Sequence, residues 1–459
     1  MNSDENKYIS DLKRSDSINL PETDLPRIVI IGAGFGGINF IKKIAKNKAQ
    51  IVLIDKNNFH QFQPLLYQVA TSGLEPDSIL FPIRKLFKRY KNVFFRMAEV
   101  KEINPKTKTV YTKIGCVNYD YLIIANGTNT NFFGMEDIEK HCIGMKSIQE
   151  ALDIRSMILE NLEKAEISKN SKEREALMNF VVIGGGPTGV EIAGALAEFK
   201  RFVLKKDYPD LDAEKVNIFL LEGLDQLLNG MSDKASKKAL KYLKNLGVDV
   251  RLETSVKNYD GQEITTNKEP VMSRTVIWTA GVKGNLIRGI NPDYIVKGNR
   301  IRVNRYSQVE DYENLFAIGD IAAMISDEYP KGHPMLAQAA IQQGKHLAKN
   351  LNRKFGGKEM KKFEYTDKGA LATIGRSKAV ADLGKLKFGG FLAWLIWSAV
   401  HLFSISGFRN KLVVAVNWGW NYITYDRSNR LIIRKAKKAQ EKNIRKTMNT
   451  KETREAVEN

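Results

Sequence analysis

The stretch that decides the fold is residues 27–37, which read RIVIIGAGFGG. The β-branched run predicts a buried parallel strand, and the glycines after it fit the pattern G-x-G-x-x-G that opens a helix. Gly32 permits a tight turn, Gly34 lets the backbone approach a pyrophosphate, and Gly37 lets the helix pack close to the strand. The next apolar run ends in Asp55, whose carboxylate can accept hydrogen bonds from ribose hydroxyls. These features predict a first dinucleotide site.

The same arrangement occurs again at residues 180–191, which read FVVIGGGPTGVE. Here the following strand-like run, residues 216–221, ends in Glu222. The interval between the glycines and the acid is long, so we expect an extended helix and loop over residues 199–215. An acid at this position repels a ribose 2′-phosphate, which favours NADH over NADPH. The alternative is that Glu222 is an ordinary surface acid.

The rest of the chain alternates strand-like and helix-like segments, which predicts doubly wound parallel sheets. We expect strands at residues 121–124, 248–252 and 275–278, helices at 147–169 and 234–246, and a charged surface turn at 170–178. Two strand–glycine–helix units roughly 150 residues apart imply two such domains. The predicted fold class is therefore α/β, with two Rossmann-like dinucleotide-binding domains and a C-terminal amphipathic helical region.

Two dinucleotide sites on one chain have a simple chemical rationale. One holds FAD as a tightly bound group, because FAD carries the pyrophosphate that the first turn cradles, and the other admits NADH for hydride transfer. We therefore expect a flexible N-terminal extension at 1–26, an FAD-binding domain in two parts at 27–145 and 273–385, an NADH-binding domain at 146–272, and a C-terminal membrane-anchoring region with a basic tail at 386–459.

Charge and composition limit the classes of binding partner and cofactor that the chain can have. The formal net charge of +20 suits nucleic acid, anionic lipid or an anionic cofactor, and alone it chooses none of them. The basic segment from Arg409 onward follows the most apolar stretch of the chain, an order that favours an anionic lipid surface over nucleic acid. Cys116 and Cys142 are too few for an iron–sulfur cluster, which needs about four thiolates. The five histidines show no metal-ligand spacing, so no metal site is expected.

Several motifs resemble the type II NADH:quinone oxidoreductases, over about residues 26–426. Besides both glycine motifs, they are FQPLLYQVA at 62–70, TAGV at 279–282, FAIGD at 316–320, AQAAIQ at 337–342 and DKG at 367–369. The resemblance implies FAD-dependent oxidation of NADH with two-electron reduction of a membrane quinone. With no cluster and no evident proton path, we expect no proton pumping.

Candidate site residues follow from the motifs and from this resemblance. The candidate FAD-binding residues are Gly32, Gly34, Phe35, Gly36, Gly37, Asp55, Lys56, Gln63, Ala125, Gly127, Asp320, Ala337 and Gln338. The candidate NADH-binding residues are Gly184, Gly186, Thr188, Gly189, Val190, Glu191, Glu222, Ala280 and Gly281. The resemblance places Asp320 at the flavin ribityl chain and the AQAAIQ motif at the quinone.

Four of these residues have specific predicted roles. Gln338 and Gln342 are four residues apart and so share one helix face, which lets both amides point at a quinone headgroup. Glu191 and Lys368 are the candidate proton-handling residues, because quinone reduction consumes two protons. The alternatives are a solvated helix face for the glutamines, a helix N-terminal acid for Glu191 and a surface lysine for Lys368.

The uncharged run at residues 388–408 has the length of a membrane span, but Ser398, His401 and Ser404 recur every three positions along it. The resemblance implies monotopic attachment, with amphipathic helices in the interface. Residues 1–26 contain no apolar core of signal-peptide type, so we expect the enzyme on the cytoplasmic face of the cell membrane. A true span and a buried soluble helix are the alternatives. The expected partners are NADH, membrane quinone and anionic lipid, without nucleic acid, and a homodimer is a candidate assembly.

Three other functions compete with this prediction. A pyridine nucleotide–disulfide reductase needs a redox-active cysteine pair soon after the first glycine motif, yet residues 60–65 contain no cysteine. A sulfide:quinone oxidoreductase would have to use Cys116 and Cys142. A redox sensor would bind NADH without turnover. Bleaching of the flavin band by NADH and its recovery with quinone would distinguish the enzyme from the sensor.

Overall fold

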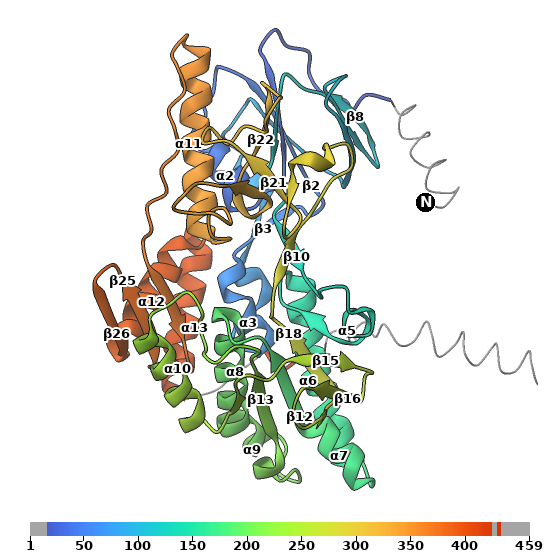
Figure 1. Ribbon diagram of the computed structural model, residues 1–459. Helices are drawn as coiled ribbons and strands as arrows, with labels where there is room; N and C mark the ends of the chain where they lie inside the picture. Colours follow the sequence, from blue (N-terminus) through green and yellow to red (C-terminus); the bar gives the residue numbers. More distant parts are fainter. Residues whose placement is uncertain (1–15, 425–428, 433–459) are drawn as a thin grey trace, which may run out of the picture. The chain divides into compact units, whose positions relative to one another are not determined.

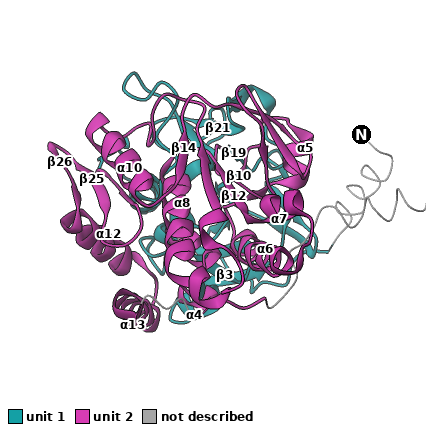
Figure 2. Cartoon of the chain, turned by 90° about the horizontal axis from the view of Figure 1, so that it is seen from below, with its two compact units in different colours: residues 1–61, 80–129, 282–368 teal, residues 62–79, 130–281, 369–459 magenta. Residues whose placement is uncertain are grey.

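The structure is a computed structural model that describes residues 16–424 and 429–432. It divides into two compact units, shown in different colours in Figure 2. Unit 1 comprises residues 1–61, 80–129 and 282–368, and unit 2 comprises residues 62–79, 130–281 and 369–459. Most of the predicted basic tail lies outside the described residues.

Unit 1 is built on a parallel five-stranded sheet (Figure 1). Its strands, in spatial order, are β22 (Leu315–Ala317), β9 (Tyr121–Ile124), β1 (Arg27–Ile31), β2 (Gln50–Asp55) and β5 (Val93–Met97). The bounds of β9 match the prediction. Alternate residues of β1 enter different cores: Ile28 and Ile30 pack on one face of the sheet, and Val29 and Ile31 on the other. This burial on both faces explains why the strand is apolar throughout.

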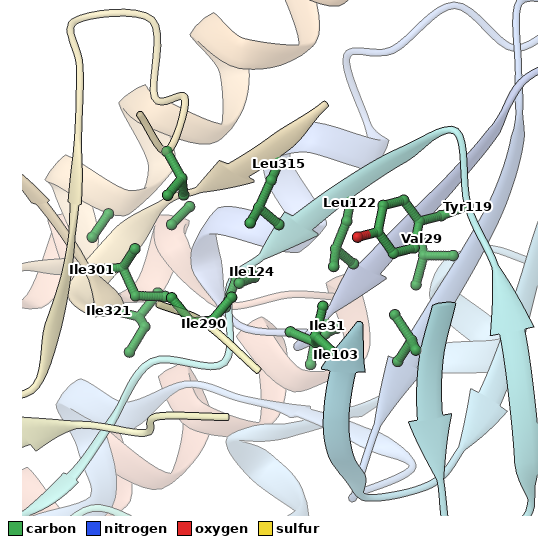
Figure 3. Packing of buried hydrophobic residues seen from close by; sticks show 14 of the residues in the cluster. Val29, Ile31, Ile103, Tyr119, Leu122, Ile124, Ile290, Ile301, Leu315 and Ile321 are labelled. Atoms are coloured by element: carbon green, nitrogen blue, oxygen red, sulfur yellow. The ribbon is translucent and has the colours of Figure 1, made fainter. Parts of the chain in front are cut away.

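The two faces of this sheet are covered differently. Helices α2 (Phe35–Ile41), α4 (Ile83–Leu86) and α11 (Ala337–Phe355) contribute to the core that contains Ile28. The opposite core, shown in Figure 3, includes Val29, Leu122 and Ile301. It also receives residues from small sheets formed by β6 (Val100–Asn104), β7 (Thr109–Thr112) and β8 (Gly115–Asn118), and by β20 (Ile295–Val296), β21 (Arg300–Val303) and β23 (Ala322–Met324). Strands β3 (Phe59–Gln61) and β4 (Leu80–Pro82) form an antiparallel pair.

The segment before β1 is only partly described, and the described part is not a loose extension. Ile18 is 7% exposed within the core of unit 1, and its N–H donates to the Cys116 carbonyl at 2.8 Å. The Pro21 carbonyl accepts a hydrogen bond from the Gln50 side chain at 2.7 Å. The segment differs from the expected loose extension at Ile18, which is buried in the core, whereas residues 21–25 are exposed. Residues 1–15 of the expected extension lie outside the described residues.

Unit 2 contains a second parallel five-stranded sheet. Its strands, in spatial order, are β11 (Ile143–Gly144), β18 (Thr275–Trp278), β12 (Asn179–Ile183), β13 (Asn217–Leu221) and β14 (Asp249–Arg251). The predicted strand at 275–278 is confirmed. The other elements up to residue 281 include α5 (Glu136–His141), α6 (Ile148–Ile167), α8 (Pro187–Phe199), α10 (Asp233–Asn245), β15 (Val256–Tyr259), β16 (Glu263–Thr266) and β17 (Val271–Met272). The chain enters this unit along β10 (Thr128–Thr130) and leaves it before β19 (Val282–Gly284).

The long interval before Glu222 is largely helical, as predicted. After α8 come a π-helical turn at Lys200–Leu204, α9 (Lys205–Asp207) and a 3-10 turn at Ala213–Lys215. The predicted surface turn at 170–178 is wrong, because Ser171–Met178 form helix α7. The Asn170 side chain caps this helix by accepting the N–H groups of Lys172 and Glu173.

The C-terminal elements also belong to unit 2. Strands β24 (Ala370–Thr373), β25 (Ala379–Leu383) and β26 (Leu386–Gly390) form an antiparallel sheet, followed by α12 (Phe391–Ser404) and α13 (Phe408–Thr424). The predicted helix at 388–408 thus starts later, because Gly390 turns the chain with a φ of 101°. Helix α3 (Leu66–Ala70) joins this unit because it packs on α6 and α8, so the observed division differs from the predicted boundaries. Within the described residues no helix combines the length and apolar character needed to cross a bilayer.

Candidate functional site

The first glycine motif forms a turn that only glycine allows. Gly32 has a φ of +107°, and a Cβ there would lie 2.4 Å from the Ala125 carbonyl oxygen. A Cβ on Gly37 would lie 2.2 Å from the Gly32 carbonyl oxygen. Gly34 is the N-cap of α2 and offers no side chain to cap it, so first-turn N–H groups face the place where a pyrophosphate fits.

Asp55 closes this turn from the end of β2. Its Oδ2 accepts the Ala33 N–H at 2.7 Å, and its Oδ1 accepts the Asn57 N–H at 2.8 Å. Burial raises the pKa of Asp55, while these two hydrogen bonds and the charge of Lys56 lower it. The carboxylate is therefore fixed at the edge of the glycine turn, with acceptor capacity left for ribose hydroxyls. The residues of this turn fit the pyrophosphate and ribose of FAD.

Two residues that support this site escaped sequence reasoning. His60 is buried and its Nδ1 donates to the Ala33 carbonyl at 2.9 Å, since a carbonyl can only accept. Burial lowers the pKa of His60 to about 4, so the ring is neutral. Gln343 is 1% exposed, and its Oε1 accepts the Gly319 N–H at 2.7 Å. This bond holds the turn that presents Asp320. Neither residue belongs to a recognisable motif.

The other candidate FAD residues divide between the units. Thr128 donates to the Asp320 carboxylate at 3.3 Å within unit 1. Ala125 and Gly127 lie directly after β9, and Ala337 begins α11 in the same unit. Phe35 and Gly36 begin α2, and the Phe35 ring meets His60 edge-on. Lys56 is exposed, and Gln63 is exposed and lies in unit 2.

Gln338 and Gln342 share one face of α11, as predicted, and both amides bind the chain at residues 366–368. The Gln342 Nε2 donates to the Thr366 carbonyl at 2.9 Å, and its Oε1 accepts the Thr366 N–H at 3.0 Å. The Gln338 Oε1 accepts the Lys368 N–H at 3.0 Å. The amides therefore position the backbone of Lys368, an exposed residue, in addition to any contact with a quinone.

The second glycine motif repeats the first in unit 2. Gly184 also has a φ of +107°, and a Cβ there would lie 2.7 Å from Ala280. A Cβ on Gly189 would lie 1.8 Å from the Gly184 carbonyl oxygen. Gly186 is the N-cap of α8 without a side-chain cap, Thr188 is exposed in the first turn and Val190 is buried. A Cβ on Gly281 would lie 2.7 Å from the Phe133 ring.

Glu222 occupies the position that Asp55 holds in unit 1. Its Oε2 accepts the Gly185 N–H at 2.5 Å, and its Oε1 accepts the Leu224 N–H at 2.8 Å. The carboxylate is therefore held against the glycine turn rather than extended into solvent. A carboxylate held in this way is the feature predicted to disfavour the 2′-phosphate of NADPH.

Glu191 lies on α8 and is 8% exposed. Its Oε1 accepts the Thr373 N–H at 3.5 Å. Burial raises the pKa of Glu191 to about 8, and the opposing effects of Thr373 and the Trp397 side chain are smaller. The carboxyl group is therefore mostly protonated at neutral pH, which a solvated acid at a helix N-terminus would not be.

A pocket in unit 2 lies beside this region. Aromatic residues of α3, α12 and α13 line it, including Tyr67, Trp394, Trp397 and Trp418. Of the three polar residues that recur along α12, two lie inward: His401 stacks on Trp397 and the Ser398 Oγ is buried. Ser404 is exposed. The apolar side chains of α12 point outward instead: Phe391, Leu392, Leu395, Val400 and Phe403 are exposed.

The cysteines offer no support for sulfide chemistry. Cys116 lies on β8 in unit 1, and Cys142 follows α5 in unit 2. Burial raises the pKa of the Cys142 thiol, which keeps it protonated and a poor nucleophile.

Two glycine turns, each closed by an acid at the end of the next strand, define a flavoprotein with separate sites for FAD and NADH. Residues 26–344 match the family model of the pyridine nucleotide-disulphide oxidoreductases, and residues 368–424 match the NDH2 C-terminal domain. The chain belongs to the type II NADH:quinone oxidoreductases, a family of FAD- and NADH-dependent enzymes.

Similarity to individual proteins supports this assignment. The chain is 34% identical to the type II NADH:quinone oxidoreductase Ndh of Mycobacterium tuberculosis, over 87% of this chain and 88% of that protein. It is 28% identical to the type II NADH:quinone oxidoreductase of Staphylococcus aureus, over 78% and 89% of the two chains. The solved structure of NDH2 from Plasmodium falciparum with NADH has the same fold, with a TM-score of 0.81, 23% identity, and coverage of 89% of this chain and 100% of that one.

Proposed function

We propose that the protein oxidises NADH with FAD and reduces a quinone by two electrons, without proton pumping. The observation that carries this proposal is the pair of equivalent nucleotide turns, closed by Asp55 and Glu222, in a chain of the type II family. FAD, when bound, supplies the chemistry that accepts a hydride from nicotinamide and releases electrons to an acceptor.

The residues of the chain then have distinct tasks in this proposal. Asp55 fixes the ribose at the first turn, and Glu222 selects NADH at the second. Glu191 holds a proton at neutral pH, because burial raises its pKa to about 8, and can therefore donate that proton as quinone is reduced. Gln338 and Gln342 position the segment that carries Lys368, whose cation stabilises developing negative charge.

The proposal also places the enzyme on the cytoplasmic face of the cell membrane, as a peripheral protein. The support is the outward-facing apolar side chains of α12 and α13, among them Leu392, Phe403 and Phe408, which suit insertion into a lipid interface. The basic residues of the C-terminal segment add attraction to anionic lipid. A homodimer is the proposed assembly, and the mass of the full chain in lipid nanodiscs tests it.

One experiment tests the central proposal. The FAD-loaded protein is mixed with NADH and then with a water-soluble quinone while the flavin absorbance is followed. The flavin band should bleach with NADH and return with quinone, over repeated cycles. A flavin that stays reduced in the presence of several quinones would contradict quinone reduction, and a flavin that NADH leaves oxidised would favour a binding protein.

A further inference from the structure

Phe133 combines an unusual backbone conformation with an exposed ring. Its φ of 54° lies in the left-handed region, which is strained for a bulky side chain. Its side chain is 59% exposed, whereas the neighbouring Phe132 is 9% exposed and belongs to a hydrophobic core of unit 2. Because this core takes the ring of Phe132 and leaves that of Phe133 exposed, core packing does not explain the strain at residue 133.

Three hydrogen bonds hold the chain in this conformation. The Asn131 N–H donates to the Gly281 carbonyl at 3.0 Å, and the Trp278 indole N–H donates to the Asn131 carbonyl at 2.8 Å. The Asn131 Oδ1 accepts the Phe133 N–H at 2.9 Å. The turn at residues 131–133 is therefore fastened to the end of β18, which fixes where the Phe133 ring lies.

The Phe133 ring lies against Gly281. Its Cζ atom is 2.7 Å from the position that a Cβ on Gly281 would occupy, so a larger residue at 281 would displace the ring. The ring centroid is 6.4 Å from that of Trp278, the last residue of β18. Gly281 follows Ala280, whose backbone approaches Gly184 closely. The exposed aromatic ring thus lies one residue from the contact between the end of β18 and the second glycine turn.

The order of strands in unit 2 relates this ring to the proposed NADH site. Strands β18 and β13 pair with β12 on opposite sides and run parallel to it, so their carboxyl ends meet at one edge of the sheet. In a Rossmann-like domain the pyrophosphate lies at the glycine turn, and the acid after the next strand binds the adenosine ribose. With Glu222 after β13 as that acid, the adenosine half of NADH lies on the β13 side. The nicotinamide half then extends toward the end of β18, where Gly281 and the Phe133 ring lie.

We propose that Phe133 binds the nicotinamide half of NADH, with its exposed ring as an apolar surface that positions the nicotinamide ring for hydride transfer. This inference rests on the proposed NADH site closed by Glu222, and it adds to that site a residue outside both glycine motifs. A flat nicotinamide ring packs favourably on an aromatic side chain. Strained backbone is retained at binding sites where the surrounding contacts fix it, as the hydrogen bonds of Asn131 do here.

Equilibrium binding to the FAD-loaded full chain tests this inference without turnover. The two probes are tetrahydro-NAD, an analogue of NADH that does not donate a hydride, and ADP-ribose, which lacks the nicotinamide ring. Calorimetry gives both dissociation constants. In Phe133→Gly the Kd for tetrahydro-NAD should rise by about fivefold, the size of one aromatic contact, while that for ADP-ribose stays unchanged. Phe133→Tyr keeps the ring and should bind both probes as the wild type does.

Thermal unfolding of the same variants separates binding from a structural role. Glycine adopts a φ of 54° without strain, so the Tm of Phe133→Gly should be unchanged or higher. A lower Tm with an unchanged Kd for tetrahydro-NAD would show a packing role and overturn the inference. Lys108→Gly is the matched control, because Lys108 is an exposed residue of unit 1 with a φ of 52°. This variant should leave both dissociation constants unchanged.

The other outcomes distinguish this inference from the function on which it rests. Equal weakening of both probes in Phe133→Gly overturns the role of Phe133, because the effect would then not involve the nicotinamide ring. A wild type that binds neither probe contradicts the proposed NADH site itself. If Phe133→Gly does not fold, Phe133→Ala removes the ring and keeps a non-glycine residue at this position. An unchanged Kd for tetrahydro-NAD in that variant overturns the inference.

Discussion

Asp55 and Glu222 occupy equivalent places in the two units. Each carboxylate accepts the N–H of the second residue in its own glycine motif, from Ala33 at 2.7 Å and from Gly185 at 2.5 Å. Each carboxylate also accepts the N–H of the residue two positions after the acid itself, at 2.8 Å in both cases. The acid is thus part of the turn, beside the proposed site of the dinucleotide ribose.

This placement predicts selectivity for NADH. The specificity constant for NADH should exceed that for NADPH by at least about tenfold, because Glu222 repels a 2′-phosphate. Glu222→Gln removes the charge and keeps an acceptor for the Gly185 N–H, so the preference should shrink. Asp225→Asn, an exposed acid nearby in sequence, is the control and should leave the ratio unchanged. Equal constants for both nucleotides in the wild type would refute the role of Glu222.

The glutamine pair on α11 should affect one half-reaction. Gln342→Leu breaks both hydrogen bonds to Thr366 and loosens the segment before Lys368. Quinone reduction should slow by about tenfold, while flavin reduction by NADH stays near the wild-type rate. Stopped-flow absorbance measures the two steps separately, and Lys345→Gln on the exposed side of α11 is the control. Equal slowing of both steps would place Gln342 in the wrong half-reaction.

Glu191 should make stability depend on pH. Its folded-state pKa lies above the unfolded value of 4.5, so its contribution is complete below about pH 4.5 and is lost as pH rises through about 8. The Tm of Glu191→Gln relative to the wild type should therefore increase between pH 5 and pH 9. Glu214→Gln is the control, because hydrogen bonding to Lys205 lowers the pKa of this exposed carboxyl group and keeps it ionised. A difference in Tm that stays constant over this range would show that Glu191 is not buried as a neutral acid.

Membrane attachment is best tested by substitutions on the outer face of α12. A truncation after Lys387 is a less suitable test, because it would also remove the buried Trp397. It would remove, in addition, the hydrogen bonds from Asn410 and Asn417 to residues 75–77. Leu392→Gln combined with Phe403→Gln should weaken binding to anionic vesicles and slow reduction of a bilayer quinone. Activity with a water-soluble quinone should persist.

The control for this prediction is Ile167→Gln, since Ile167 is 80% exposed at the end of α6. Vesicle sedimentation and both quinone assays are measured on all variants. High salt should weaken binding of the wild type only in part, because the apolar contacts remain. Undiminished sedimentation of the double variant would show that α12 does not attach the protein.

The parts of the fold that sequence reasoning predicted are those with strong local signals. The β-branched runs before both glycine motifs fixed two parallel strands, and the strand at 275–278 was predicted at its observed bounds. The charges of the segment at 170–178 predict a surface turn, but the segment forms a helix. Asn170 caps this helix, and its end at Ala176–Met178 is buried. Charge alone does not separate an exposed helix from a turn.

Site residues that belong to a sequence motif can be predicted, whereas contacts between segments far apart in the sequence cannot. The pocket lined by Tyr67, Trp397 and Trp418 joins helices far apart in the sequence, and no local pattern predicts it. The shared face of Gln338 and Gln342 was predictable from spacing, but their hydrogen bonds to Thr366 and Lys368 depend on how the chain returns after α11. His60 and Gln343 support the turns through single bonds to backbone atoms, which sequence cannot reveal.

The outward apolar side chains of α12 and α13 have a practical consequence for handling the protein. Phe403 and Phe408 are 75% and 82% exposed, and Leu412 and Val416 extend the same character along α13. In detergent-free buffer such a surface associates with whatever apolar material is present, including other copies of the chain. Particle sizes measured under those conditions would reflect nonspecific association through these helices and not a functional subunit interface.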